Sequence, residues 1–153
     1  MKELLNYAKA SPAAIKAFLG VETYVRGAGL DPALIELVKM RASQLNGCAY
    51  CLDMHSKDAR AAGESEQRLY ALPAWREAPF YSQRERAALA WTEAVTRLAD
   101  GPVPEALYGE LREQFNEKEA VDLTMAIIAI NGWNRLAAVF RSPAPGSYQP
   151  RHK

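Results

Sequence analysis

The sequence predicts an all-α protein of about six or seven helices packed as one bundle. Three observations predict this fold class. Helix-capping signals recur along the chain, apolar residues repeat at helical spacing, and no segment shows the alternation expected of a strand. The 153 residues are 49% hydrophobic and 24% charged, which is ordinary for a single globular domain with its own core.

Two early helices are each predicted to begin at a proline that follows a capping residue. Ser11-Pro12 precedes "AAIKAFLGVETYV", and Asp31-Pro32 precedes "ALIELVKMRASQL". Ser and Asp are favoured at the N-cap, and proline fits the first helical position because its missing N–H costs nothing there. Asn46-Gly47 is a helix-breaking pair and predicts the end of the second of these helices.

The middle of the chain continues the same pattern. The segment 48–63 is predicted to be a helix that stops at Gly63, since glycine is the usual residue just beyond a helix end. Ser82 and Glu85 form a capping box ahead of "QRERAALAWTEAVTRLA". The proline-rich segment 100–104 then predicts a turn.

The last predicted helix is also the most apolar. Asn116 and Glu119 are expected to cap it, and it extends to about Arg141. Its middle, "AVDLTMAIIAI", is apolar on nearly every side, so it is expected to be a central helix or an oligomer interface. We expect residues 1–141 to form the domain and the polar, proline-rich residues 142–153 to form an extended or mobile tail.

Charge and hydropathy exclude several classes of partner. There are 19 basic and 18 acidic residues, so the chain lacks the basic excess of a nucleic-acid-binding protein. No apolar run reaches the roughly 18 residues of a membrane span, and the first 20 residues do not resemble a secretory signal. A cytoplasmic location is therefore expected, with no membrane partner. In that compartment two cysteines do not indicate a structural disulfide framework.

The chemistry-bearing segment is "QLNGCAYCLDMHSKDAR", which holds both cysteines of the chain. On a helix, Cys48, Cys51 and His55 form one stripe, because residues three or four apart are neighbours. The positive helix start favours a thiolate at Cys48, and His55 can take a proton from Cys51. The pattern is typical of a redox dithiol, in which a thiolate attacks and the second thiol resolves the sulfenic acid as a disulfide.

Other interpretations of this segment stay open at the level of the residues. Cys48, Cys51 and His55, with Glu36 as a fourth ligand, could form a zinc site. The remaining alternative is a purely structural one, in which the two cysteines are buried in the core beside a histidine whose hydrogen bonds are made within the protein. Covalent haem attachment is excluded, because it requires histidine directly after the second cysteine, where Leu52 stands. A thioredoxin-like site requires a βαβ context that this sequence lacks.

The longer stretch "ELVKMRASQLNGCAYCLDMHSKDARAAG" resembles the core motif of the alkylhydroperoxidase D family, within the carboxymuconolactone decarboxylase-like superfamily. The resemblance extends from about Pro32 to Arg141. The family pattern is Glu, eleven residues, Cys-x-x-Cys, three residues and His. In this sequence it falls on Glu36, Cys48, Cys51 and His55.

The resemblance implies an all-helical fold, assembly into homo-oligomers (trimers or hexamers) and a thiol-dependent, antioxidant peroxidase activity on small hydroperoxides. It implies that Cys51 attacks, Cys48 resolves, and His55 with Glu36 relays the proton. The helix dipole alone would favour Cys48 as the attacking sulfur, but that effect is worth about 1 kcal/mol or less. No bound cofactor or metal is expected, and an external thiol or dithiol must act as the reductant.

One position departs from the family pattern. The best-known members carry histidine two residues after the first cysteine, and here Tyr50 stands there. Tyr50 is a candidate relay residue because it occupies this position. A phenol with a pKa near 10 is a poor proton carrier at neutral pH, so the substitution implies a shorter proton relay and weaker peroxidase turnover. The rival functions are a carboxymuconolactone decarboxylase-like enzyme, which would not require paired cysteines, and a non-peroxidatic disulfide reductase or redox-sensing oligomer.

Three polar residues outside the motif carry further expectations. Arg41 lies among apolar neighbours in its predicted helix, so we expect it to form a salt bridge with a carboxylate in the core. Asn131 and Asn134 lie in the second half of the last predicted helix. We expect their side chains to hydrogen-bond to backbone near the cysteine helix.

Overall fold

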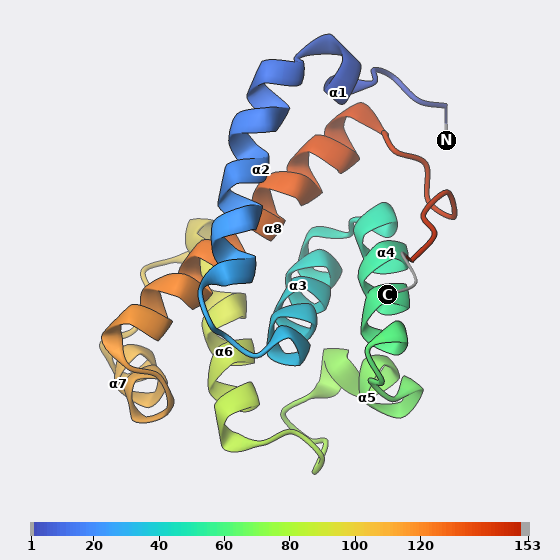
Figure 1. Cartoon of the computed structure of the whole chain (residues 1–153). Coiled ribbons are helices and arrows are strands. Elements are labelled where there is room, and N and C mark those ends of the chain that lie inside the picture. Colours follow the sequence, from blue (N-terminus) through green and yellow to red (C-terminus); the bar gives the residue numbers. More distant parts are fainter. Residues whose placement is uncertain (1, 151–153) are drawn as a thin grey trace.

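The computed structural model describes residues 2–150, and within that range it contains eight α-helices, two short 3-10 helices and no strand (Figure 1). The helices are α1 (Tyr7–Ala10), α2 (Pro12–Gly27), α3 (Pro32–Asn46), α4 (Ala49–Ala61), α5 (Glu66–Ala71), α6 (Gln83–Thr96), α7 (Glu105–Gln114) and α8 (Glu117–Phe140). The all-α prediction is confirmed. The expected count of six or seven was slightly low, because helices as short as α1 and α5 are too brief to show a periodic pattern.

Most of the predicted helix ends are confirmed by their capping hydrogen bonds. Asp31 accepts from the backbone N–H of Ala33 at 2.9 Å at the start of α3. Gly47 ends α3 in the left-handed conformation, with φ of 64°. Ser11 is an exception, since its side chain makes no capping bond to α2. Its backbone N–H instead closes the last turn of α1, so Pro12 alone marks the helix start.

Both predicted capping boxes are present. Ser82 accepts from the backbone N–H of Glu85, whose carboxylate accepts the Ser82 N–H in return, at the start of α6. Asn116 and Glu119 make the same reciprocal pair at the start of α8. These ends were predictable because a capping box depends only on residues three apart.

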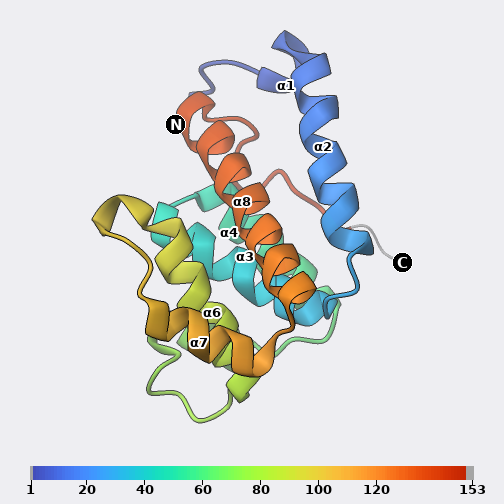
Figure 2. The same ribbon diagram turned by 90° about the vertical axis from the view of Figure 1, so that its left-hand side faces the viewer.

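Two helices organise the core. α3 packs against α4, α6 and α8, and α8 also packs against α2, α4 and α6. Figure 2 shows α8 crossing in front of α3 and α4. The fully buried side chains Leu37, Val38, Leu123, Ile127 and Ile130 lie on α3 and α8. α8 is therefore a central helix, which is one of the two roles that its sequence left open.

By length and average hydropathy alone, α8 resembles a membrane-spanning helix. This was not predicted from the sequence, because only the apolar middle of the helix was considered. Among the described residues it is the one helix whose length and composition would suffice to cross a membrane. A core helix passes the same test. The packing of α8 against five other helices accounts for its apolar sequence.

A glycine lets α2 lie close to α8. A Cβ on Gly132 would come within 2.3 Å of the Phe18 ring, so only glycine fits this contact. The Phe18 ring then packs against Trp133, with 4.5 Å between the ring centroids. Further along the same pair of helices, the Tyr24 hydroxyl donates to the buried Asp122 carboxylate at 2.7 Å.

The chain after α8 turns back along α4 (Figure 1). The Phe140 carbonyl accepts from the backbone N–H groups of Leu4 and Leu5, and the Ser142 hydroxyl donates to Glu3 at 2.9 Å. Residues 144–150, which we call the C-terminal segment, then reach α4 through hydrogen bonds described below. Of the predicted tail, residues 151–153 lie outside the described range.

Candidate redox site

The turn between α3 and α4 is held in place by amide side chains from α8. The Asn46 side chain donates to the Oδ1 atoms of Asn131 and Asn134, at 2.9 and 2.8 Å. Asn134 donates in turn to the Ser43 hydroxyl at 3.0 Å. The two α8 asparagines were expected to bond to backbone near the cysteine helix; the structure places them close to that position, but on side chains of α3. The network fixes the point at which Cys48 enters the core.

Cys48 and Cys51 form a disulfide, with 5.4 Å between their Cα atoms. Cys48 is the N-cap of α4, and its sulfur accepts from the Cys51 backbone N–H at 3.3 Å. Each residue is only 2% exposed, and both pack against Ile130 and Ala137 of α8. The structure thus brings together the two sulfurs that the sequence placed on one stripe.

His55 lies one helical turn after Cys51 and is buried. Its Nδ1–H donates to Oε2 of Glu36 on α3 at 2.8 Å, and the two side chains are 5% and 21% exposed. Burial alone would raise the pKa of Glu36. The hydrogen bond from His55 and the charges of His55, Lys39 and Arg26 outweigh burial, so the pKa of Glu36 lies below its usual value. Glu36 is therefore ionised at neutral pH.

One of those charges belongs to a second buried pair. Lys39 lies one turn after Glu36 on α3, and its ammonium binds Glu22 of α2 at 2.9 Å, with side chains 6% and 10% exposed. Trp133 of α8 donates its indole N–H to the other oxygen of Glu22 at 3.1 Å. A buried ion pair is costly unless its remaining hydrogen-bonding capacity is met, and Trp133 meets part of it here.

Tyr50 lies on the first turn of α4, half-buried against the cysteine cluster. Burial raises the pKa of its phenol, and the nearby carboxylates of Asp53 and Asp58 raise it further, while Lys57 lowers it. Its hydroxyl makes no side-chain hydrogen bond to the described residues. A role for Tyr50 in proton transfer therefore stays a prediction.

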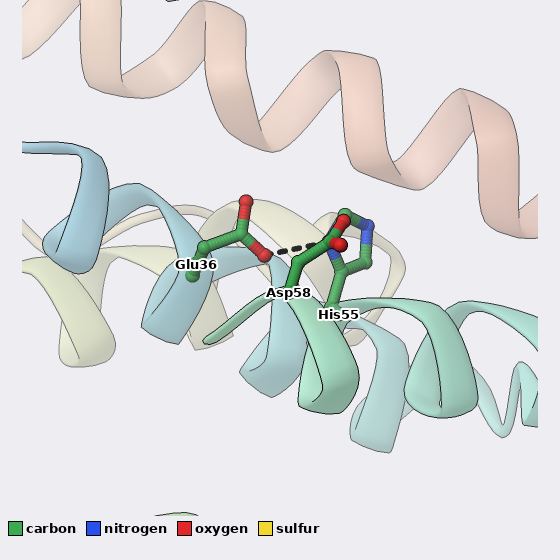
Figure 3. A group of neighbouring side chains, drawn as sticks. All are labelled: Glu36, His55 and Asp58. Atoms are coloured by element: carbon green, nitrogen blue, oxygen red, sulfur yellow. Dashed lines mark hydrogen bonds and ion pairs between the residues drawn. The ribbon is translucent and has the colours of Figure 1, made fainter. Parts of the chain in front are cut away.

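Two residues of the site were missed by the sequence reading. Asp58 lies on α4 with its carboxylate beside Glu36 and His55 (Figure 3), and Tyr148 of the C-terminal segment donates its hydroxyl to Asp58 at 2.7 Å. Asp58 could have been found, because it lies three residues after His55 and shares its helix face. Tyr148 could not, since it is 90 residues from Asp58 along the chain.

The same three side chains are the group that could hold a metal ion. One ligand atom from each of Glu36, His55 and Asp58 lies within 4.8 Å of the other two. Carboxylate oxygen and imidazole nitrogen suit zinc and similar divalent cations. This ligand set differs from that of the zinc alternative left open by the sequence, which required both cysteine sulfurs; here the sulfurs are joined to each other.

An all-helical bundle with a Cys-x-x-Cys disulfide and a His–Glu pair across α3 and α4 defines an alkylhydroperoxidase D-like protein. The sequence profile of the carboxymuconolactone decarboxylase family matches residues 10–94, which is more than half of the chain. The chain therefore belongs to the carboxymuconolactone decarboxylase family. The family resemblance that the motif indicated is confirmed.

Individual relatives agree with this assignment. The chain is 42% identical over 137 residues to the uncharacterized protein YdfG of Bacillus subtilis, covering 90% of this chain and 93% of YdfG. A crystal structure of ATU0492 from Agrobacterium tumefaciens superposes with a TM-score of 0.90 at 49% identity, covering 94% of this chain and 99% of that one. ATU0492 is described as a protein of unknown function and a candidate antioxidant defence protein AhpD. The debrominase Bmp8, with a TM-score of 0.78 at 24% identity, covering 88% of this chain and 72% of that one, shares the fold.

Proposed function

We propose that this protein is a thiol-dependent peroxidase that reduces organic hydroperoxides. The observation that carries the proposal is the Cys48–Cys51 disulfide one helical turn from a histidine bonded to a carboxylate. This is the arrangement that a dithiol peroxidase needs in its oxidised state. The description of ATU0492 as an antioxidant candidate, and of a Silicibacter protein at 25% identity as peroxidase-related, supports the same reaction class.

The proposed cycle starts from the reduced protein. The Cys51 thiolate attacks the terminal oxygen of the hydroperoxide, so that an S–O bond forms and the O–O bond breaks. His55, held by Glu36, supplies the proton that lets the alkoxide leave as an alcohol. Glu36 remains ionised through this step, which keeps the imidazole oriented by its Nδ1–H and leaves Nε2 for proton transfer.

The second half of the cycle regenerates the observed state. Cys48 attacks the sulfur of the Cys51 sulfenic acid, an S–S bond forms and water leaves. One hydroperoxide and two thiols thus give one alcohol, one water and one disulfide. An external thiol or dithiol then reduces the disulfide and supplies the two electrons.

The test is a thiol count on reduced protein before and after one equivalent of an organic hydroperoxide. We expect two free thiols to fall to none. Cys51→Ser should consume no peroxide, and Cys48→Ser should complete one turnover and stop at the sulfenic acid. If Cys51→Ser consumes peroxide as fast as the parent, the attacking residue is misassigned, and if both variants match the parent, the proposal fails.

We also propose that the chain acts as a homo-oligomer, the trimer or hexamer that the family resemblance implies. Val121, Ile128 and Val139 of α8 are 60%, 48% and 61% exposed, and their spacing of seven and eleven residues places them on one face. An exposed apolar stripe of this kind is typical of an interaction surface. Light scattering should report a smaller species for Ile128→Asp than for Leu98→Asp, a change at a leucine that is 58% exposed and lies outside α8. Equal masses for the two variants would contradict this.

A further inference from the structure

The C-terminal segment is tied to α4 by three hydrogen bonds on the solvent side of the redox site. The backbone N–H of Gly146 donates to the Asp53 carboxylate at 3.0 Å, and the Lys57 ammonium donates to the Tyr148 carbonyl at 3.0 Å. The third bond is the one from the Tyr148 hydroxyl to Asp58. The first two fix the backbone on either side of the third, so the Tyr148 ring has a defined position.

That position is next to the charges of the site. Burial raises the pKa of Tyr148 to about 12, together with the hydrogen bond to Asp58 and the charges of Asp58, Tyr50 and Glu36. Tyr148 therefore stays a protonated hydrogen-bond donor at any physiological pH. Its hydroxyl reaches the site through Asp58, to which it donates at 2.7 Å.

Asp58 is the residue that connects Tyr148 to the imidazole. In Figure 3 its carboxylate points toward the His55 ring from the same helix, while Glu36 approaches the ring from α3. An oxygen of Asp58 lies within 4.8 Å of both an oxygen of Glu36 and a ring nitrogen of His55. At that distance a negative charge acts appreciably on the imidazole, even with partial solvent screening.

Glu36 is the first carboxylate beside the His55 ring, and apart from Asp58 the other groups around the ring do not duplicate its effect. α3 contributes Glu36 and Lys39, α2 contributes Arg26 through its charge on Glu36, and α4 contributes Tyr50, Asp58 and the disulfide. α8 presents the apolar side chains of Ile130 and Ala137. Asp58 is thus the second carboxylate of the site, and Tyr148 is the donor that holds it.

We propose that Asp58 and Tyr148 are positioning residues of the redox site. The C-terminal segment places the Tyr148 hydroxyl on Asp58, and this bond keeps a second carboxylate beside the His55 imidazole instead of letting it turn out into water. The inference deepens the proposed function, on which it rests for the role of His55. It assigns residues 144–150 a role at the redox site rather than in stabilising the helical bundle.

The experiment follows the His55 ring by NMR as a function of pH in the oxidised protein, with a chelator present so that no metal ion occupies Glu36, His55 and Asp58. The disulfide removes thiol ionisation from the titration, and the chain has only two histidines, so His55→Gln identifies the signal. Asp58→Asn removes one negative charge near the ring. We expect it to shift the balance between protonated and neutral imidazole about three- to tenfold toward neutral, which is about 0.5 to 1 pH unit in the midpoint.

Tyr148→Phe should shift the midpoint in the same direction by a smaller amount, because the released Asp58 carboxylate gains better hydration away from the ring. In the double variant the Tyr148 substitution should add nothing, since its effect passes through Asp58. Tyr108→Phe, at a half-exposed tyrosine of α7, is the matched control and should leave the midpoint unchanged.

Two results would overturn the inference. One is an unchanged His55 midpoint in Asp58→Asn, and the other is a Tyr148→Phe shift of equal size with and without Asp58. Both readouts are independent of peroxide. A parent protein that fails to consume hydroperoxide but shows the expected shifts would therefore reject the proposed function and retain the positioning role.

Discussion

Two carboxylates accept hydrogen bonds where α3 meets its neighbours: Glu36 of α3 at the contact with α4, and Glu93 of α6 at the contact with α3. On the α6 side, Glu93 accepts from Arg41 of α3 and from the Trp75 indole N–H, each at 2.8 Å, and from Arg76 at 2.7 Å. The predicted pairing of Arg41 with a carboxylate is confirmed here. Burial alone would raise the pKa of Glu93, but these hydrogen bonds and the Arg41 charge hold it below its usual value.

On the α4 side, Glu36 accepts from His55, and its pKa is lowered as well. Burial and the direction of the pKa shift are therefore alike for Glu36 and Glu93. The difference is in the donors, because guanidinium and indole groups keep their protons at any physiological pH, whereas an imidazole exchanges its proton. A lowered carboxylate pKa does not distinguish a reactive site from a structural ion pair, but the chemistry of the donor does.

The largest expected effect comes from removing the exchangeable donor. His55→Gln keeps a hydrogen bond to Glu36 but cannot deliver a proton, so we expect the hydroperoxide reduction rate to fall about 10²- to 10⁴-fold. The thermal unfolding midpoint should stay near that of the parent. Stopped-flow peroxide consumption and calorimetry measure the two quantities. A variant that keeps the parent rate would place the proton donor elsewhere and remove the contrast between the two carboxylates.

The sequence could predict those residues whose positions depend on local spacing or on the family motif. Glu36, Cys48, Cys51 and His55 fall in a fixed register, and the capping boxes of α6 and α8 depend on neighbours three residues apart. The donors to Glu93 could not be assigned, because Trp75 and Arg76 approach it from an irregular segment. The contact of Tyr148 with Asp58 could not be predicted either, since nothing in a proline-rich tail indicates which helix it will contact.

The second effect is on the structural carboxylate. Glu93→Gln leaves the Arg41 guanidinium, only 12% exposed, without its counter-charge. Breaking a buried pair in this way costs about 3 kcal/mol in the free energy of unfolding. Urea denaturation should show this loss, and Glu117→Gln, at a carboxylate that is 87% exposed, should change the value by less than about 0.5 kcal/mol. Hydroperoxide reduction by the folded Glu93→Gln protein should match the parent.

The third effect tests Glu36 itself. Glu36→Gln retains an oxygen acceptor for the His55 Nδ1–H but removes the charge that stabilises the protonated ring. We expect about a tenfold loss in rate, smaller than for His55→Gln because Nε2 is still present to transfer a proton. Peroxide consumption across a pH series should show the loss at every pH at which Glu36 is ionised in the parent. If Glu36→Gln is as active as the parent while Glu93→Gln is not, the two carboxylates have been assigned the wrong way round.

The smallest effect is the acid dependence of stability. Glu36 and Glu93 each have a folded-state pKa below the ordinary value of 4.5. Each therefore contributes stability that is complete above about pH 4.5 and is lost as the pH falls from there through the folded-state pKa. Urea unfolding of parent and Glu93→Gln from pH 7 to pH 3 should give free energies that converge at the acid end, because protonated Glu93 no longer pairs with Arg41. The other carboxylates with lowered pKa are common to both proteins and cancel in the difference. A constant gap between the two curves would mean that Glu93 stabilises the fold through its shape and neutral hydrogen bonds rather than through its charge.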